Sequence, residues 1–348
     1  MSKEKKESTK LRGWMIDATR LLEKPEYYRK IIDRCAEWNI NTILFRVVAD
    51  DVCAMQLKNH PELKQHPNAF STSQMRALVR YAKASGIMLI PEVESFGHTS
   101  YISSSKKYAH LLDKSGKRKG FTGLIHGHPE TVQLMRELYS EIATVFDAPY
   151  IHGGCDEVKW GDSKTSKEAL KSRSRGSIMA DYFNTLNGIA KELKRELILW
   201  ADHITGHSVE PDLLEHLDKD IILHDWNYWD QDPTIIRKRL EKATNIGMRV
   251  IGGPAWGWCR WVSRPGREQL NNINGYADAC KKLDTDQVLG VITTNWCPYR
   301  YLPDAIWDGI AYAGVAMEHG VQVAVAEAFK MFVEKHFSAR YTDDWAEV

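Results

Sequence analysis

The segment YAKASGIMLIPEVESFGH at residues 81–98 contains the unit from which the predicted fold is built. It joins the end of a helical segment, Gln74–Ala84, to a short apolar run, Ile87–Pro91, and the run is followed at once by two glutamates and a histidine. Apolar residues three or four positions apart indicate an amphipathic helix, and a short apolar run after a glycine indicates a buried strand. The segment therefore predicts a helix, a strand and a polar turn in that order.

The same unit recurs along the chain. Apolar runs predict eight strands, at Gly13–Asp17, Thr42–Val48, Ile87–Pro91, Tyr150–Gly153, Leu197–Ala201, Ile221–His224, Arg249–Gly252 and Val288–Thr293. Helical periodicity predicts helices at Tyr27–Trp38, Gln74–Ala84, Thr131–Phe146, Ser177–Arg195, Pro233–Asn245, Glu268–Leu283 and Pro303–His319. Alternating strands and helices indicate a parallel sheet, and eight repeats favour closure into a barrel.

We therefore predict an α/β fold with a single (β/α)₈ barrel over residues 11–320. A disordered tail at residues 1–10 and a C-terminal helix at residues 321–348, packed on the barrel, complete the predicted organisation. A chain of 348 residues has room for two domains, but no linker rich in proline, glycine or serine divides it.

The composition excludes several classes of function. A formal net charge of +1 gives no basic footprint for nucleic acid, and no apolar stretch approaches the length of a membrane span. The six cysteines form no CxxC pair, and the polar start of the chain lacks the apolar core of a secretory signal. We therefore expect free thiols, a cytoplasmic location and no nucleic-acid or membrane partner.

Polar and aromatic residues follow the predicted strands. Barrel enzymes build their sites at the carboxyl ends of the strands, so these side chains should meet at one mouth. Flat aromatic faces pack against the apolar face of a pyranose, and acids bind its hydroxyls, which indicates a carbohydrate site. The residues are Asp17, Arg20, Asp50, Asp51, Glu92, Glu94, His98, Asp156, Glu157, Asp202, His203, Asp225, Trp226, Tyr228, Trp256, Trp258 and Trp296.

The segment YIHGGCDEVKW at residues 150–160 carries the strongest chemical signal, because a glycine turn after a strand presents two adjacent carboxylates. A solvated acidic pair in a loop is the alternative interpretation. Glycosidases commonly place two carboxylates on opposite sides of the scissile bond, about 5–5.5 Å or about 6.5–9.5 Å apart, and neighbouring residues cannot easily straddle a sugar. The substrate's own acetamido oxygen is then the natural nucleophile. Glu157 would protonate the leaving oxygen, and Asp156 would hold the acetamido N–H.

These residues also carry a family resemblance. From about residue 11 to residue 320 the chain resembles glycoside hydrolase family 20, the β-N-acetylhexosaminidases. The segments that match are Arg12–Arg20, Asn41–Asp51, His60–Leu63, Tyr81–His98 and the His-x-Gly-x-Asp-Glu signature at His152–Glu157. Cys155 and the lack of an N-terminal accessory domain resemble the hexosaminidase D branch, whose members are intracellular.

The resemblance implies a role for each site residue. It makes Glu157 the acid/base and Asp156 the acetamido-orienting carboxylate. For substrate binding, it implies that Arg20 grips the ring hydroxyls and that a polar network lies beside the acid, formed by Glu94, His98, His152 and Asp51. It also implies that Trp200, Trp226 and Trp296 enclose the acetamido group and the ring. The phenol of Tyr228 would hydrogen-bond the acetamido oxygen, with Asp225 nearby. Core packing is the alternative interpretation for the tryptophans and histidines.

Two departures from the family pattern stand out. The family usually has Trp-x-Glu after the last strand, where the chain has Trp296-Cys297-Pro298, and Trp226 stands where related sequences often place a tyrosine. Both changes leave open the preference between gluco and galacto sugars.

The sequence thus predicts a retaining exo-β-N-acetylhexosaminidase that releases terminal β-linked GlcNAc or GalNAc through an oxazolinium, with no cofactor or metal. Its partner would be a glycan or glycoconjugate with a terminal N-acetylhexosamine. The oligomeric state is left open, a homodimer included. Two alternatives are a glycan-binding barrel with a degraded site and a hydrolase for hexosides that lack the acetamido group.

Overall fold

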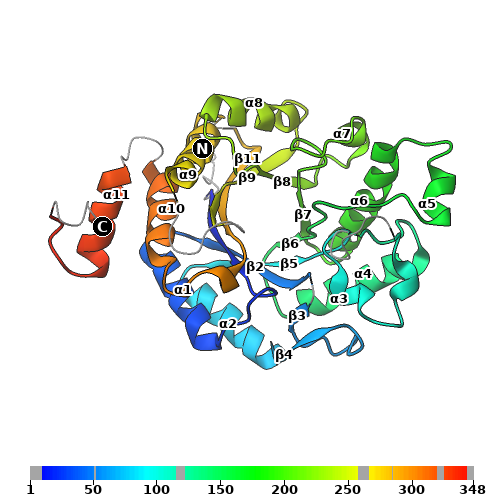
Figure 1. The fold of residues 1–348 in the computed structure, drawn as a ribbon, viewed down its shortest axis with the longest axis horizontal. Helices are drawn as coiled ribbons and strands as arrows, with labels where there is room; N and C mark the ends of the chain where they lie inside the picture. The colour runs from blue at the N-terminus through cyan, green and yellow to red at the C-terminus, as the bar shows by residue number, and fades with distance from the viewer. Residues whose placement is uncertain are drawn as a thin grey trace, which may run out of the picture.

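The barrel strands close into a complete parallel ring (Figure 1). The computed structural model describes residues 10–50, 52–114, 122–257, 266–283, 285–319 and 325–342. The strands pair in the order β1-β11-β9-β8-β7-β6-β5-β2, and β2 pairs with β1. They are β1 Leu11–Asp17, β2 Thr42–Ala49, β5 Met88–Val93, β6 Tyr150–His152, β7 Glu196–Trp200, β8 Ile222–Trp226, β9 Arg249–Gly253 and β11 Val288–Asn295. The predicted (β/α)₈ barrel is confirmed.

Helices surround the ring and bury the faces that the periodicity indicated. The first helix, for example, buries Tyr28, Ile31, Ile32 and Cys35 and begins at a proline, which suits the first turn of a helix. The large helices are α1 Pro25–Glu37, α2 Thr72–Ala84, α4 Pro129–Ala143, α6 Arg175–Glu192, α8 Pro233–Thr244, α9 Arg267–Leu283 and α10 Trp307–His319.

Shorter elements interrupt this alternation. Strand β7 is followed by a single helical turn, α7 Leu213–His216, in place of a full crossover helix. The other additions are β3 Val52–Met55, β4 Gln65–Phe70, α3 Ser100–Ser103, α5 Lys164–Ala169 and β10 Ala255–Gly257. Helix α11, Val325–His336, packs outside the ring, where Phe332 meets Trp38 and Phe329 stacks on Tyr312 (Figure 1). In the part of the chain that the structure describes, no helix has the length and apolar character to cross a membrane.

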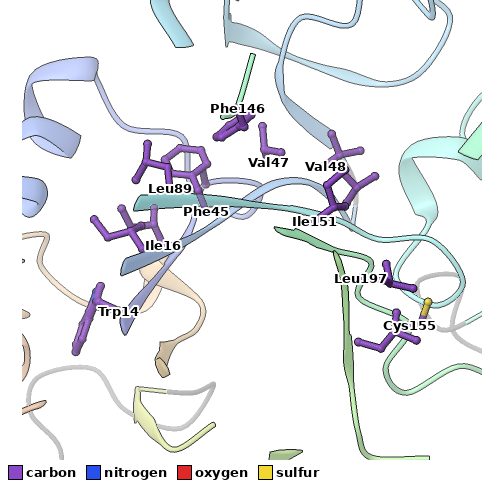
Figure 2. Close-up of a cluster of buried hydrophobic side chains, with 14 of the residues drawn as sticks. Trp14, Ile16, Phe45, Val47, Val48, Leu89, Phe146, Ile151, Cys155 and Leu197 are labelled. Carbon is purple, nitrogen blue, oxygen red and sulfur yellow. The ribbon is translucent and has the colours of Figure 1, made fainter. Parts of the chain in front are cut away.

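Two apolar layers form the core. One layer lies between the strands and the helices, and Figure 2 shows part of it. There the ring centroids of Phe45 and Phe146 lie 6.5 Å apart. The other fills the barrel, where Met15, Leu44 and Ile90 belong to the inner cluster. Strand residues alternate between these layers, since successive side chains point to opposite faces. At the carboxyl ends of the strands, the inner layer gives way to buried polar and aromatic side chains, and the candidate site lies there.

Candidate active site

The two predicted catalytic carboxylates lie on a tight turn after β6, which we call the acidic turn (residues 153–158). Backbone φ is +65° at Gly154, +76° at Cys155 and +48° at Glu157, all in the left-handed region. A residue other than glycine adopts this region only when its surroundings hold it there, and such strain is typical of functional sites. The turn breaks the strand alternation, so both acids can face the barrel mouth.

Asp156 and Glu157 converge on one histidine. The Nε2 atom of His98 lies 3.7 Å from Asp156 Oδ2 and 3.3 Å from Glu157 Oε2, and the donor atoms of all three side chains lie within 4.8 Å of one another. Burial disfavours the imidazolium, but Asp156, Asp50 and Glu157 outweigh this and raise the pKa of His98 well above its ordinary value. These carboxylates therefore favour the imidazolium form of His98. Among the described residues, the trio could also hold a metal ion.

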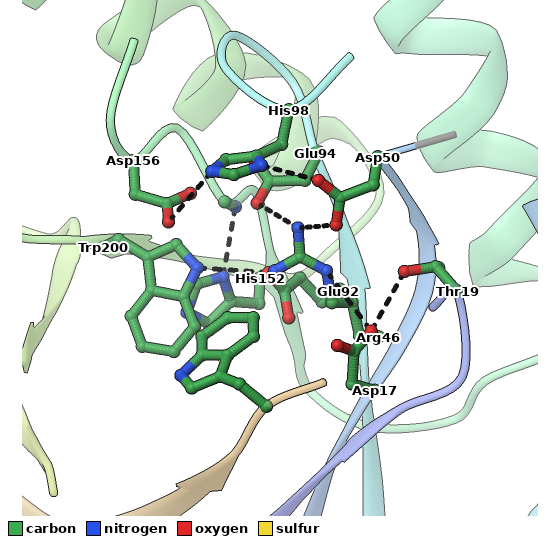
Figure 3. A network of polar contacts seen from close by, with 12 residues as sticks. Asp17, Thr19, Arg46, Asp50, Glu92, Glu94, His98, His152, Asp156 and Trp200 are labelled. Carbon is green, nitrogen blue, oxygen red and sulfur yellow. Dashed lines mark hydrogen bonds and ion pairs between the residues drawn. The ribbon is translucent and has the colours of Figure 1, made fainter. Parts of the chain in front are cut away.

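The predicted network contact of Asp51 lies outside the described residues. Its neighbour Asp50 contacts His98, with Asp50 Oδ1 2.6 Å from His98 Nδ1 (Figure 3). Asp50 also pairs with Arg20 and Arg46, each over 3.0 Å. Burial opposes ionisation of Asp50, but the two guanidinium groups outweigh it and hold the pKa of Asp50 well below its ordinary value.

Arg46, which the sequence analysis missed, is the central cation of the network. It is fully buried on β2 and contacts Glu92 over 3.3 Å, Glu94 over 3.2 Å and Asp50 over 3.0 Å (Figure 3). Burial raises the pKa of Glu92 to about 7 and that of Glu94 well above its ordinary value. The negative charge of Asp156 adds to this effect, whereas the positive charge of Arg46 opposes it. An arginine inside an apolar run was the available signal, because a buried guanidinium needs several partners.

Arg20 lies at the edge of this network. Its guanidinium pairs with Asp17 over 3.0 Å as well as with Asp50, and it lies over the Trp296 ring at 5.2 Å. The side chain keeps 20% of its surface exposed, unlike the fully buried Arg46. Arg20 therefore reaches the mouth, where a sugar hydroxyl could accept from it.

Aromatic side chains from three strands form one continuous wall. Trp200 and Trp296 lie 5.8 Å apart, and the Trp296 Nε1–H donates to the Tyr228 hydroxyl over 2.6 Å. The rings of Tyr228 and Trp226 lie 5.0 Å apart. The four predicted aromatic residues are thus brought together, although Trp200, at 1% exposure, forms the floor rather than the rim.

His152 lies beneath the acidic turn. Its Nδ1 accepts the Gly154 N–H over 3.1 Å, so the neutral ring carries its proton on Nε2 and donates to His224 Nδ1 over 3.2 Å. Burial lowers the pKa of His152 well below its ordinary value and that of His224 to about 3. His152 was predicted to contact the acid's polar network. In the structure it holds the backbone of the turn and packs on Trp200, 4.5 Å away.

Asp225 lies outside the site, and its predicted role is corrected. Its carboxylate accepts from Arg239 Nε over 2.9 Å, from the Tyr276 hydroxyl over 2.9 Å and from Thr205 over 2.6 Å. Strand β8 extends to Trp226, whose ring belongs to the inner cluster, so the preceding residue must point to the outer face. Asp225 therefore ties β8 to helices α8 and α9.

The arrangement has a defined chemical capacity. Asp156 Oδ1 is buried and accepts no hydrogen bond from the described residues, so it is available to an N–H donor. Glu157 is more open, with 37% of its side chain exposed. The aromatic wall offers apolar faces, and Arg20 offers donors at the mouth. Together these groups suit a pyranose ring that carries an amide.

Comparisons with known proteins identify relatives of the chain. The β-hexosaminidase subunit beta of Felis catus is 24% identical over 266 residues, which cover 72% of this chain and 48% of that protein. The Flavobacterium johnsoniae chitobiase structure has a TM-score of 0.74 at 20% identity, covering 94% of this chain and 51% of that one. The dispersin B structure has a TM-score of 0.63 at 18% identity, and the match covers 89% of this chain and 99% of that one. Those structures establish the shared fold.

The chain spans about half the length of the feline relative. Residues 10–296, by contrast, match the family model described as glycosyl hydrolase family 20, catalytic domain. This range contains the acidic turn, His98, Arg20 and the aromatic wall. The chain therefore belongs to glycosyl hydrolase family 20.

Proposed function

We propose that the protein is a retaining exo-β-N-acetylhexosaminidase that releases terminal β-linked N-acetylglucosamine or N-acetylgalactosamine. The observation that carries the proposal is the placement of Asp156 and Glu157, which face one histidine from one turn. The feline relative's name, β-hexosaminidase, supports the same activity. The family and the aromatic wall support a sugar substrate, and the buried oxygen of Asp156 supports a substrate that carries an N–H.

The reaction would proceed in two steps. Glu157 donates its proton to the glycosidic oxygen while the acetamido oxygen attacks the anomeric carbon, so that the glycosidic bond breaks and an oxazolinium ring forms. Asp156 accepts a hydrogen bond from the acetamido N–H and offsets the positive charge of that ring. Glu157, now a carboxylate, takes a proton from water, and the resulting hydroxide opens the ring at the anomeric carbon. Two inversions leave the configuration retained.

Four other acids at the mouth support substrate assistance, because each of them pairs with an arginine. Asp17 and Asp50 pair with Arg20, and Glu92 and Glu94 pair with Arg46. A classical retaining enzyme needs a second carboxylate free to attack the sugar. The acetamido oxygen fills that role here.

The test is hydrolysis of 4-nitrophenyl β-glycosides of N-acetylglucosamine, N-acetylgalactosamine, glucose and galactose. We expect turnover of one or both N-acetyl substrates, little of the plain hexosides, and inhibition by a thiazoline that mimics the oxazolinium. Glu157→Gln should lower kcat by about 10²–10⁴-fold, the range that general acid catalysis contributes. Turnover of plain hexosides at equal rates would favour a hydrolase that ignores the acetamido group. Tight sugar binding without turnover would favour a glycan-binding barrel. This outcome is worth testing because the chain has Trp296-Cys297-Pro298 where the family usually has Trp-x-Glu.

A further inference from the structure

Side chains from the neighbouring strand hold the backbone of the acidic turn. The Glu157 N–H donates to Asp202 Oδ2 over 3.0 Å, and the Val158 N–H donates to His203 Nε2 over 3.2 Å. Asp202 and His203 come directly after β7, which pairs in parallel with β6 (Figure 1). The end of one barrel strand therefore holds the turn that leaves its neighbour.

These two hydrogen bonds act where the backbone is strained. Glu157 has φ of +48°, a conformation in which its Cβ crowds the backbone. The direction of the Glu157 side chain follows from this backbone conformation, since φ orients the Cα–Cβ bond. The peptide groups that flank the Glu157 side chain are those held by Asp202 and His203. Loss of either acceptor would leave an N–H of the turn without its partner and let the turn relax.

The two acceptors are themselves fixed. Because Nε2 of His203 accepts, the neutral ring carries its proton on Nδ1 and donates to the Ser208 carbonyl oxygen over 3.2 Å. The Ser208 N–H donates back to the Asp202 carbonyl oxygen over 3.0 Å, and the Glu210 N–H donates to the His203 carbonyl oxygen over 2.8 Å. The side chains of Asp202 and His203 are 0% and 6% exposed. A folded loop thus presents two buried, oriented acceptors to the turn.

We propose that Asp202 and His203 are positioning residues for the acid Glu157. They hold its backbone in the left-handed conformation that aims its carboxyl group at the leaving oxygen. The inference rests on the proposed function, because it assigns these residues to the proton-transfer step of that reaction. A role in folding alone is the competing explanation.

The dependence of rate on the leaving group separates the two explanations. A basic leaving group such as phenolate needs the proton of Glu157, whereas 2,4-dinitrophenolate departs with little help. We expect Asp202→Ala and His203→Ala each to lower kcat/KM for the phenyl N-acetylhexosaminide by about 100-fold, as a misplaced catalytic group does. For the 2,4-dinitrophenyl substrate we expect a loss of less than about threefold.

Conservative variants and a matched control complete the experiment. Asp202→Asn and His203→Gln keep an acceptor near the original position, so we expect them to recover the phenyl substrate rate to within about fivefold of wild type. His60→Gln removes another buried histidine, 3% exposed and paired with Glu62 and Glu137, that has no contact with the turn. It should change the two substrate rates by the same factor. Circular dichroism and thermal unfolding check that each variant is folded.

Three results would overturn the inference: equal losses on both substrates, no loss on either, or conservative variants as impaired as the alanine variants. Failure of the wild-type protein to hydrolyse any N-acetylhexosaminide is a different result. It would refute the proposed function itself, and the positioning role with it.

Discussion

The buried histidine pair beneath the acidic turn makes the protein sensitive to acid. His224 has a folded-state pKa of about 3, against an ordinary value of about 6.5 in the unfolded chain. Because folding lowers the pKa of His224, this side chain binds more protons in the unfolded chain than in the native state once pH falls below about 6.5. Folding is therefore destabilised from about pH 6.5 downward, and the loss continues until pH falls through the folded value.

The magnitude at pH 5 follows from these two values. At that pH, His224 is charged in the unfolded chain and neutral in the native state, so its contribution to the free energy of unfolding falls by about 2 kcal/mol between pH 7 and pH 5. The pKa of His152 is lowered as well, because burial and His224 disfavour its charge, and its contribution has the same sign. Protonation of His152 would also remove the acceptor for the Gly154 N–H and so release the turn.

The perturbation is His224→Gln, which removes the titrating ring. We expect the decrease in unfolding free energy between pH 7 and pH 5, measured by urea denaturation, to be about 2 kcal/mol smaller in the variant than in wild type. His216→Gln is the control, because that side chain is 50% exposed, and it should leave the decrease unchanged. An identical pH dependence in His224→Gln and wild type would refute the reasoning.

Three further predictions follow from the buried network and the turn. Arg46→Met leaves several buried carboxylates without their cation and should lower the free energy of unfolding by about 3–5 kcal/mol, and a loss below about 1 kcal/mol in urea denaturation would contradict it. Asp225→Ala removes one of the two carboxylates that pair with Arg239 and should lower the free energy of unfolding by about 1–3 kcal/mol, while KM for the hexosaminide stays within about twofold. A tenfold rise in KM would restore Asp225 to the site. Gly154→Ala places a Cβ against the Glu94 carboxylate at φ of +65° and should lower kcat/KM at least about tenfold. Gly188→Ala, whose added Cβ has nothing within 4 Å, should leave kcat/KM unchanged.

The fold was predictable because its signal repeats. Each strand is a short apolar run and each large helix has an apolar stripe, and the structure places them at the expected positions within a few residues. Closure of the ring followed from the number of repeats. The additional strand β4 lacked an apolar run in the sequence, because the segment Gln65–Phe70 is half exposed and contains a proline.

The site was predictable in composition and less so in detail. The aromatic residues Trp200, Trp226 and Trp296 lie together because each ends or follows a strand on the inner face. Arg46 could have been found, since a charge within an apolar strand requires buried partners. Asp225 was misplaced because the strand was expected to end at His224. With the strand continuing to Trp226, alternation sends Asp225 outward.

Other features depend on backbone geometry that no pattern of residue types specifies. Asp50 contacts His98 because its own backbone is left-handed, with φ of +45°. The support of the acidic turn by Asp202 and His203 likewise depends on the path of the loop after β7. Such contacts join residues about 45 positions apart. The residues can be recognised in the sequence, but which of them contact each other cannot be predicted from it.

In the proposed reaction, the acetamido group of the sugar is the nucleophile. The most direct test of this role is the rate of hydrolysis of a series of aryl β-hexosaminides in which the N-acetyl group carries zero, one, two or three fluorine atoms. Fluorine withdraws electron density from the amide oxygen, so kcat should fall steeply and steadily along the series. A rate that does not depend on the number of fluorine atoms would mean that a group on the protein attacks the sugar, and it would contradict substrate-assisted catalysis.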